Sequence, residues 1–283
     1  TIGPNGQSQQ VRLPYRPTQV GQFDFVVEVQ PLEGELTGEN NRQMRSVQVR
    51  KEKIRVLLVQ GGPSFEFRYL RNMLQRDETI ALHTLLQDAD LEHAQQDPSA
   101  LRAFPTRRED LFAYDVIILG DADPALLGAS ALRNLADFVD QPAKGGALVL
   151  IAGPSFMPTA YRDTPLAALL PVNLDTASAP TPGSALDQGF APQPTRLGIT
   201  SPQMQLADSV PASLAVWREM PDWYWSLTAP DLRSGARVLA SDPSRLGSGG
   251  EHLPMISMQF VGAGKVIFHA TDETYRWARH SGG

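Results

Sequence analysis

The sequence predicts an α/β domain built on a parallel sheet, preceded by a small fragment of β structure. Residues 54–74 have the pattern of a buried strand, a tight turn and an amphipathic helix, which is the opening unit of a parallel α/β sheet. The rest of the region 54–283 continues to alternate short apolar runs with segments of helical periodicity. Residues 1–53 instead show the two-residue alternation of half-buried strands.

Residues 1–53 are expected to form a partial β module that ends in a short charged joint. Phe23, Phe25 and Val27 alternate with mostly polar residues, and a second strand is expected over Met44–Val49. The order of strand, polar loop and strand resembles the closing part of bacterial immunoglobulin-like modules. Two or three strands are too few for a complete sandwich, so the fragment is expected to be incomplete and the domain boundary to fall at residue 53.

The region 54–283 begins with a strand at Ile54–Val59, the Gly61-Gly62 turn and a helix that runs from Phe65 to Leu74. Further strands are expected over Ile80–Leu86, Asp115–Leu119, Ala147–Ala152 and Arg237–Ala240, and as a hairpin of Met255–Phe260 with Lys265–His269. Helices are expected after a capping box at Thr106–Glu109, near residues 129–141, after Thr164 and Pro165, and over Thr271–Arg279. Residues 177–194 are rich in turn-forming residues and are expected to form an exposed excursion.

Composition excludes several classes of function. The 283 residues are 42% hydrophobic and 20% charged, which is ordinary for a soluble globular protein. The net charge of −6 and the lack of a dense Lys/Arg run argue against nucleic acid as a partner. Zero cysteines exclude a disulfide framework, thiolate metal sites and a cysteine nucleophile. No apolar run approaches the roughly 18 residues that a membrane span needs.

Five blocks of sequence, taken in order, resemble a known bacterial family. They are RVLLVQGGPSFEFRYLRNML, FPTRREDLFAYDVIILGD, GGALVLIAGPSF, TPLAALLPV and GAGKVIFHATDETYRW. Together they look like the class I glutamine amidotransferase-like domain of large membrane-anchored proteins that also carry von Willebrand A-type segments. The resemblance spans about residues 54–279, and it implies a flavodoxin-like parallel sheet with helices on both faces.

The same resemblance implies a cellular setting. It implies that the preceding strands belong to an extracytoplasmic β module and that transmembrane helices elsewhere in the full-length protein tether the domain. An extracytoplasmic, cell-envelope location in a membrane-anchored protein is therefore expected. The resemblance does not imply an activity, because none is assigned to this family.

The chain lacks the nucleophile of a working class I glutamine amidotransferase. Such an enzyme needs a thiolate on a sharp strand-to-helix turn and a His–Glu pair from near the end of the chain. The strand at 147–152 leads into Gly153-Pro154-Ser155, where that turn would fall, and there is no cysteine there. Glutamine hydrolysis by the usual mechanism is excluded, so the leading hypothesis is a catalytically silent binding or scaffold domain.

A serine-dependent hydrolase is the first alternative. Gly153-Pro154-Ser155 matches part of the G-x-S-x-G nucleophile elbow, but the closing glycine is missing. His269, at the end of an expected strand, is the candidate base, and Asp272 or Glu273 the candidate orienting residue. The structural alternative is that Ser155 caps a turn and His269 ends a strand.

A ligand-binding cleft is expected at the carboxyl ends of the strands, where open parallel sheets bind ligands. Its candidate residues are Gly61, Gly62, Glu66, Arg68, Asp121, Gly153 and Ser155. Glu66 is also well placed to cap or salt-bridge a helix. With Asp123 and Asp272, the acidic candidates could form a rim, but their spacing matches no metal motif, and Gly61-Gly62 is neither a dinucleotide fingerprint nor a P-loop.

No cofactor and no metal are therefore expected, and the partner is expected to be a small polar ligand or a protein. An aromatic cluster suggests a further alternative, a carbohydrate-binding module that uses Trp217, Trp223 and Trp225. That hypothesis requires the rings to be exposed in one groove. The structural alternative is that they pack in the core.

Overall fold

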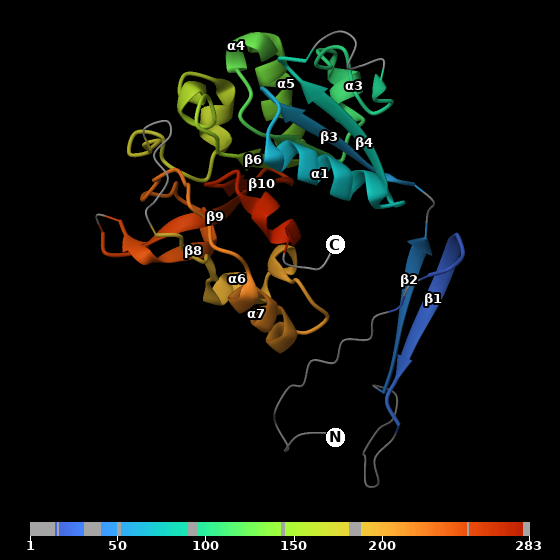
Figure 1. Ribbon diagram of the computed structural model, residues 1–283. Helices are drawn as coiled ribbons and strands as arrows, with labels where there is room; N and C mark the ends of the chain where they lie inside the picture. The colour runs from blue at the N-terminus through green and yellow to red at the C-terminus, as the bar shows by residue number, and fades with distance from the viewer. Residues whose placement is uncertain are drawn as a thin grey trace. The chain divides into compact units, whose positions relative to one another are not determined.

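A computed structural model describes residues 15, 17–30, 41–49, 52–89, 96–142, 145–180, 188–247 and 249–279 (Figure 1). The chain divides into two compact units, Thr1–Glu52 and Lys53–Gly283. Each unit has its own sheet. Residues 50 and 51 of the expected charged joint lie outside the described residues.

The first unit contains an antiparallel ribbon of two strands, β1 (Gly21–Glu28) and β2 (Arg42–Val49). Both predicted strands are confirmed, and β2 begins two residues before its predicted start. Phe23 lies opposite Val47, and Phe25 shares its face of the ribbon because side chains alternate along a strand. Tyr15 packs edge-on against Phe25, with ring centroids 5.1 Å apart.

The second unit is built on an eight-stranded sheet with the order β4-β3-β5-β6-β10-β9-β8-β7. Its first five strands are parallel: β4 (Ile80–Leu86), β3 (Ile54–Gln60), β5 (Val116–Leu119), β6 (Ala147–Ile151) and β10 (Gly264–His269). The remaining three are antiparallel: β9 (His252–Val261), β8 (Arg237–Leu246) and β7 (Gln193–Pro194). This mostly parallel sheet with its helices is an α/β fold, as predicted.

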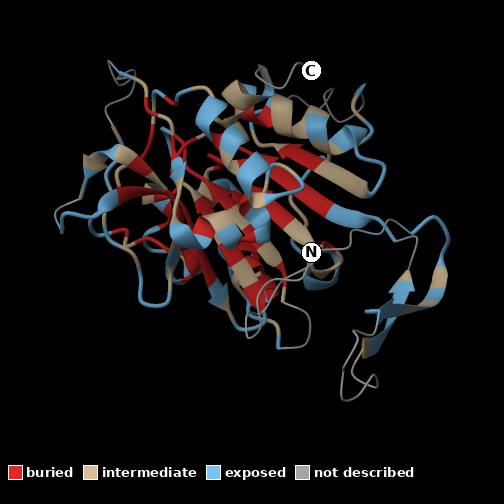
Figure 2. Cartoon of the chain, turned by 90° about the horizontal axis from the view of Figure 1, so that it is seen from below, coloured by how far each residue is buried: buried red, intermediate tan, exposed pale blue. Residues whose placement is uncertain are grey.

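The parallel strands are apolar on both faces because both faces are covered. In β3, Leu57 and Val59 belong to the larger hydrophobic cluster, and Val56 and Leu58 belong to the smaller one. All four side chains are at most 3% exposed. Figure 2 shows the buried residues concentrated along the strands, whereas the helices carry exposed and intermediate residues as well as buried ones.

The two faces are covered by different helices. On the face of the smaller cluster, α1 (Phe65–Arg76) contributes Phe67. The face of the larger cluster is covered by α5 (Ala129–Val139) and by the 3₁₀ helix η3 (Pro165–Leu169). The other helices are α3 (Arg108–Phe112), α4 (Pro124–Leu127), α6 (Arg196–Thr200), α7 (Val210–Glu219), η2 (Thr159–Tyr161), η4 (Pro202–Met204) and η5 (Thr274–Arg279).

Three helical predictions are wrong in detail. The capping box at Thr106–Glu109 does not form, because α3 begins at Arg108 after an N-cap residue whose side chain makes no capping hydrogen bond. The predicted helix after Thr164 is present as a 3₁₀ helix, with Thr164 in the N-cap position and Pro165 in the first turn. The Thr164 hydroxyl, however, donates to the Tyr161 carbonyl at 2.8 Å instead of making a capping hydrogen bond. The final helix, η5, is also 3₁₀.

The segment expected to be an exposed excursion is partly built into the core. Ser178 and Phe190 form isolated bridges with Thr228 and Trp223, and the Phe190 side chain is buried. Residues 181–187 lie outside the described residues. The prediction failed because small and turn-forming residues dominate the segment locally, whereas its bridges are to residues more than 30 positions away.

Candidate functional site

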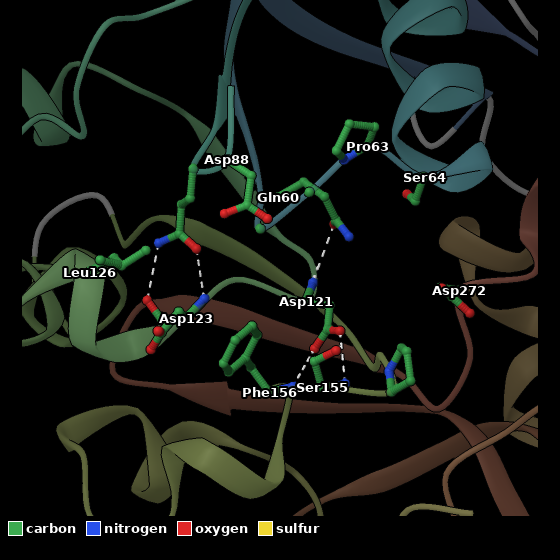
Figure 3. A pocket seen from close by; sticks show the side chains of 14 residues that line it. Gln60, Pro63, Ser64, Asp88, Asp121, Asp123, Leu126, Ser155, Phe156 and Asp272 are labelled. Atoms are coloured by element: carbon green, nitrogen blue, oxygen red, sulfur yellow. Dashed lines mark hydrogen bonds between the residues drawn. The ribbon is translucent and has the colours of Figure 1, made fainter. Parts of the chain in front are cut away.

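A polar cleft of about 310 Å³ lies at the carboxyl ends of the parallel strands (Figure 3). Each of the five parallel strands contributes residues at or just after its carboxyl end. They are residues 60–64 from β3, Gln87 and Asp88 from β4, Asp121 and Asp123 from β5, residues 154–156 from β6, and Asp272 from β10. The structure thus places Gly61, Gly62, Asp121 and Ser155 on one cleft, with Gly153 directly behind Asp121. Glu66 and Arg68 do not line it.

The Asp121 carboxylate binds the turn that follows β6. Its oxygens accept hydrogen bonds from the backbone N–H groups of Ser155 at 2.9 Å, Phe156 at 2.6 Å and Met157 at 2.8 Å. The side chain is 9% exposed. Three consecutive amides that face one carboxylate form an anion-binding concavity of backbone dipoles, and here the anion that fills it belongs to the protein.

Glycines provide the space that this carboxylate needs. A Cβ on Gly153 would lie 2.3 Å from Asp121 Cγ, and a Cβ on Gly61 would lie 2.3 Å from the Asp121 carbonyl oxygen. A Cβ on Gly120 would lie 1.8 Å from Gln60 Oε1. Gly61, Gly120 and Gly153 therefore allow the neighbouring strand ends to pack closely together.

Two glutamines at the strand ends hold the chain after β5. Gln60 Oε1 accepts the N–H of Asp121 at 3.2 Å. Gln87 binds the backbone of Asp123 at both of its polar groups, donating from Nε2 to the carbonyl at 3.0 Å and accepting the N–H through Oε1 at 2.7 Å. The Asp123 carboxylate in turn caps α4 by accepting the Ala125 N–H at 2.8 Å.

The cleft is lined by acidic residues. Asp88 and Asp272 make no hydrogen bond from their side chains to another residue in the described part of the chain. Burial raises the pKa of Asp272 to about 6, and the charges of Glu273 and Asp121 act in the same direction. Among the described residues, no lysine, arginine or histidine lines this cleft.

The predicted hydrolase residues do not form a catalytic array. Ser155 is exposed at the rim, and within the described ranges its hydroxyl makes no hydrogen bond to His269. The Nδ1 atom of His269 is buried without a partner, and burial lowers the pKa of this imidazole to about 4. A neutral His269 with no bond to Ser155, Asp272 or Glu273 lacks the orienting contacts that a general base of this kind uses.

Glu66 has a structural role that connects α1 to the end of the chain. Its carboxyl group accepts hydrogen bonds from the Thr274 hydroxyl and from the Tyr275 N–H, the latter at 2.7 Å. Burial raises the pKa of Glu66 to about 7, against the opposing effect of these hydrogen bonds. Arg68, the other candidate from this helix, lines a separate depression together with Phe65 and Arg71.

The tryptophans expected for sugar stacking are largely in the core. Trp217 is 5% exposed and Trp223 is fully buried, and both pack on Trp277 with ring centroids 5.2 and 4.9 Å apart. Trp225 is half-buried against the same cluster. The structure therefore supports the packing alternative, because these rings do not share an exposed groove.

Sequence reasoning missed two polar residues of the cleft, Gln87 and Asp88. Both fall at the start of a segment interpreted as a polar loop. The signal that could have found them is positional: each ends or directly follows a strand that was itself predicted. The carboxyl-end rule that selected Asp121 selects them equally.

Comparison with known proteins shows similarity only among solved structures. No protein-family model matches the chain, and no curated protein matches it in sequence. A cytoplasmic protein from Salmonella typhimurium LT2 is 19% identical, with 91% of this chain and 87% of that chain covered and a TM-score of 0.45. A second cytoplasmic protein from Salmonella typhimurium is 16% identical, with 89% and 85% covered and a TM-score of 0.45. A β-galactosidase from Bacillus circulans sp. alkalophilus is 15% identical, with 82% of this chain but 30% of that chain covered and a TM-score of 0.40. We take nothing about function from likenesses this distant.

The expected extracytoplasmic location is contradicted. Both Salmonella proteins are described as cytoplasmic, so that expectation is not kept. Within the described residues, every helix falls short of the length or hydrophobicity that crossing a bilayer requires.

Proposed function

We propose that the second unit is a catalytically silent binding domain of the class I glutamine amidotransferase-like type, whose polar cleft takes a small ligand. Two features support the assignment to this type. The five parallel strands follow one another across the sheet as second, first, third, fourth and fifth in chain order, which is the order of flavodoxin-like sheets. The turn after β6, where the family places its nucleophile, carries Ser155 in place of cysteine.

The position of the Asp121 carboxylate is the observation that carries the silent assignment. Enzymes with a nucleophile on a strand-to-helix turn stabilise the developing oxyanion with backbone N–H groups next to that nucleophile. Here the N–H groups of Ser155, Phe156 and Met157 are already bound by a carboxylate. An oxyanion beside Ser155 would lose these donors and would lie next to a negative charge.

The test is a search for turnover that depends on Ser155. The wild-type protein and Ser155→Ala are assayed with p-nitrophenyl acetate and with γ-glutamyl p-nitroanilide, under conditions that detect slow hydrolysis. We expect the two proteins to give the same background rate with both substrates. Turnover by the wild type that disappears in Ser155→Ala would contradict the proposal of a catalytically silent domain and would favour a serine-dependent hydrolase instead.

The first unit supports a separate, structural proposal. We infer that its ribbon is part of an immunoglobulin-like module, because Phe23 and Phe25 share one face, as the core face of a sandwich sheet requires. Val27 and Val47, on that same face, are exposed, and a ribbon of two strands is at best marginally stable in water. This inference predicts that a peptide of residues 15–52 gives the circular dichroism spectrum of an unfolded chain.

A further inference from the structure

We infer that the cleft binds a small organic cation that also carries a hydroxyl or carbonyl oxygen, such as an amino alcohol. This inference rests on the proposed binding function and specifies its ligand. It is drawn from the charge of the lining, from one unpaired donor and from the separation of the carboxylates.

The charge of the lining calls for a cation. Asp88, Asp121, Asp123 and Asp272 surround a space of about 310 Å³, and no basic side chain among the described residues joins them there. The Asp121 carboxylate is compensated by three amides, whereas the carboxylates of Asp88 and Asp272 have no hydrogen-bond partner on another residue in the described ranges. Concave walls of one charge sign concentrate ligands of the opposite sign.

Gln60 supplies the second, independent feature. The side chain is 8% exposed, and its Oε1 is committed to the N–H of Asp121. Because an N–H can donate only to the oxygen of the carboxamide, this bond fixes which way the group points. Its Nε2 makes no hydrogen bond to any described residue and points into the cleft (Figure 3). An open donor on an otherwise buried side chain favours a ligand that brings an acceptor oxygen.

A metal ion does not fit the same residues. Hard cations such as Ca²⁺ need several oxygen ligands that converge within about 2.6 Å of one point. Across the described part of the chain, no three acidic, histidine or cysteine side chains are grouped closely enough to hold an ion. The carboxylates stand around the cleft instead, as suits an ammonium group whose several N–H donors reach separate acceptors.

A matched series of probes tests the inference by NMR titration of the whole chain at pH 8. The probes are trans-2-aminocyclohexanol, cyclohexylamine, which lacks the oxygen, and trans-1,2-cyclohexanediol, which lacks the charge. We expect the amino alcohol to bind at least about tenfold more tightly than either of the others, because each loses one charge-assisted or buried hydrogen bond. Its perturbed amide signals should include those of residues 60–62, Ser155 and Phe156.

Three variants locate the binding. We expect Asp88→Asn and Asp272→Asn each to weaken the amino alcohol severalfold, whereas Asp208→Asn, which removes an exposed carboxylate away from the cleft, should leave the affinity unchanged. Equal binding of the diol and the amino alcohol would contradict the inference that the ligand is a cation, while leaving the proposal of a binding domain in place. Failure of all three probes to bind would also contradict the inference. Turnover that depends on Ser155 would instead overturn the proposed function, whatever the probes do.

Discussion

Burial and hydrogen bonding act in opposite directions on the carboxyl group of Glu66. The residue is 4% exposed and receives two hydrogen bonds from the start of η5, yet the pKa of Glu66 is raised to about 7. The groups that act on this carboxyl are the Thr274 hydroxyl, the Tyr275 amide and the acidic Asp272, and among the described residues no cation joins them, so burial dominates. The folded state therefore favours the protonated form.

This residue gives the protein a predictable dependence on pH. A raised pKa means that the stabilisation is complete below the unfolded value of about 4.5 and is lost as the pH rises through about 7. Ionisation of Glu66 should cost on the order of 3 kcal/mol. Glu66→Gln keeps the shape and the neutral form of this side chain. We therefore expect its free energy of unfolding, measured with urea, to increase relative to that of the wild type as the pH is raised from 5 to 8.

The exposed Glu78, which has no such environment, provides the control. Because the Glu78 side chain is exposed, Glu78→Gln controls for the loss of one surface carboxylate and should change the free energy of unfolding by less than about 0.5 kcal/mol. If the difference between Glu66→Gln and the wild type proves independent of pH, then Glu66 does not titrate in this range and the pKa given above for Glu66 is wrong.

At the scale of the element, the turn after β6 depends on a fit between backbone and side chain. A Cβ on Gly153 would overlap the Asp121 side chain at 2.3 Å, and that side chain is buried and bound on both oxygens. We expect Gly153→Ala to destabilise the second unit by roughly 3 kcal/mol, because either the turn or the carboxylate must move. Chemical denaturation monitored by tryptophan fluorescence measures the loss.

Gly249→Ala is the matched control, since a Cβ there meets nothing within 4 Å. It should change the free energy of unfolding by less than about 0.5 kcal/mol. A similarly small effect of Gly153→Ala would show that the contact between Asp121 and the turn is not tightly packed.

The strands of the parallel sheet were the most predictable elements. Buried parallel strands are continuous apolar runs, and Ile54–Val59 and Ala147–Ala152 have that pattern whatever surrounds them. The contacts of the last helix were not predictable, because the start of η5 is bound by Glu66, which lies 209 positions from Tyr275. The sequence also suggested Asp121 as a cleft residue but could not reveal its partners, which lie 34 to 36 positions away.

At the scale of the whole molecule, the two units differ in what stabilises them. The buried apolar residues of the described chain begin at Val56, and they form the two clusters on either side of the eight-stranded sheet. The first unit has a ribbon of two strands. The second unit therefore has the core that independent folding requires.

Removal of the first unit tests this difference. A chain that begins at Lys53 should keep the melting temperature of the second unit to within about 2 °C, measured by near-ultraviolet circular dichroism, because none of its buried core is lost. It should also bind trans-2-aminocyclohexanol as tightly as the whole chain. A fall of more than about 5 °C would mean that the first unit contributes directly to the stability of the second.

The carboxylate at the turn after β6 also bears on how the protein responds to its solution. Because Asp121 is part of the same chain, its effective concentration at the amides of Ser155, Phe156 and Met157 is set by geometry. A dissolved phosphate or sulfate ion must compete for these amides with a carboxylate that is covalently part of the chain. These amides are thus closed to external anions, and a variant with a free anion-binding site at this turn would have to lose the Asp121 carboxylate and leave the three amides unpaired in the same change.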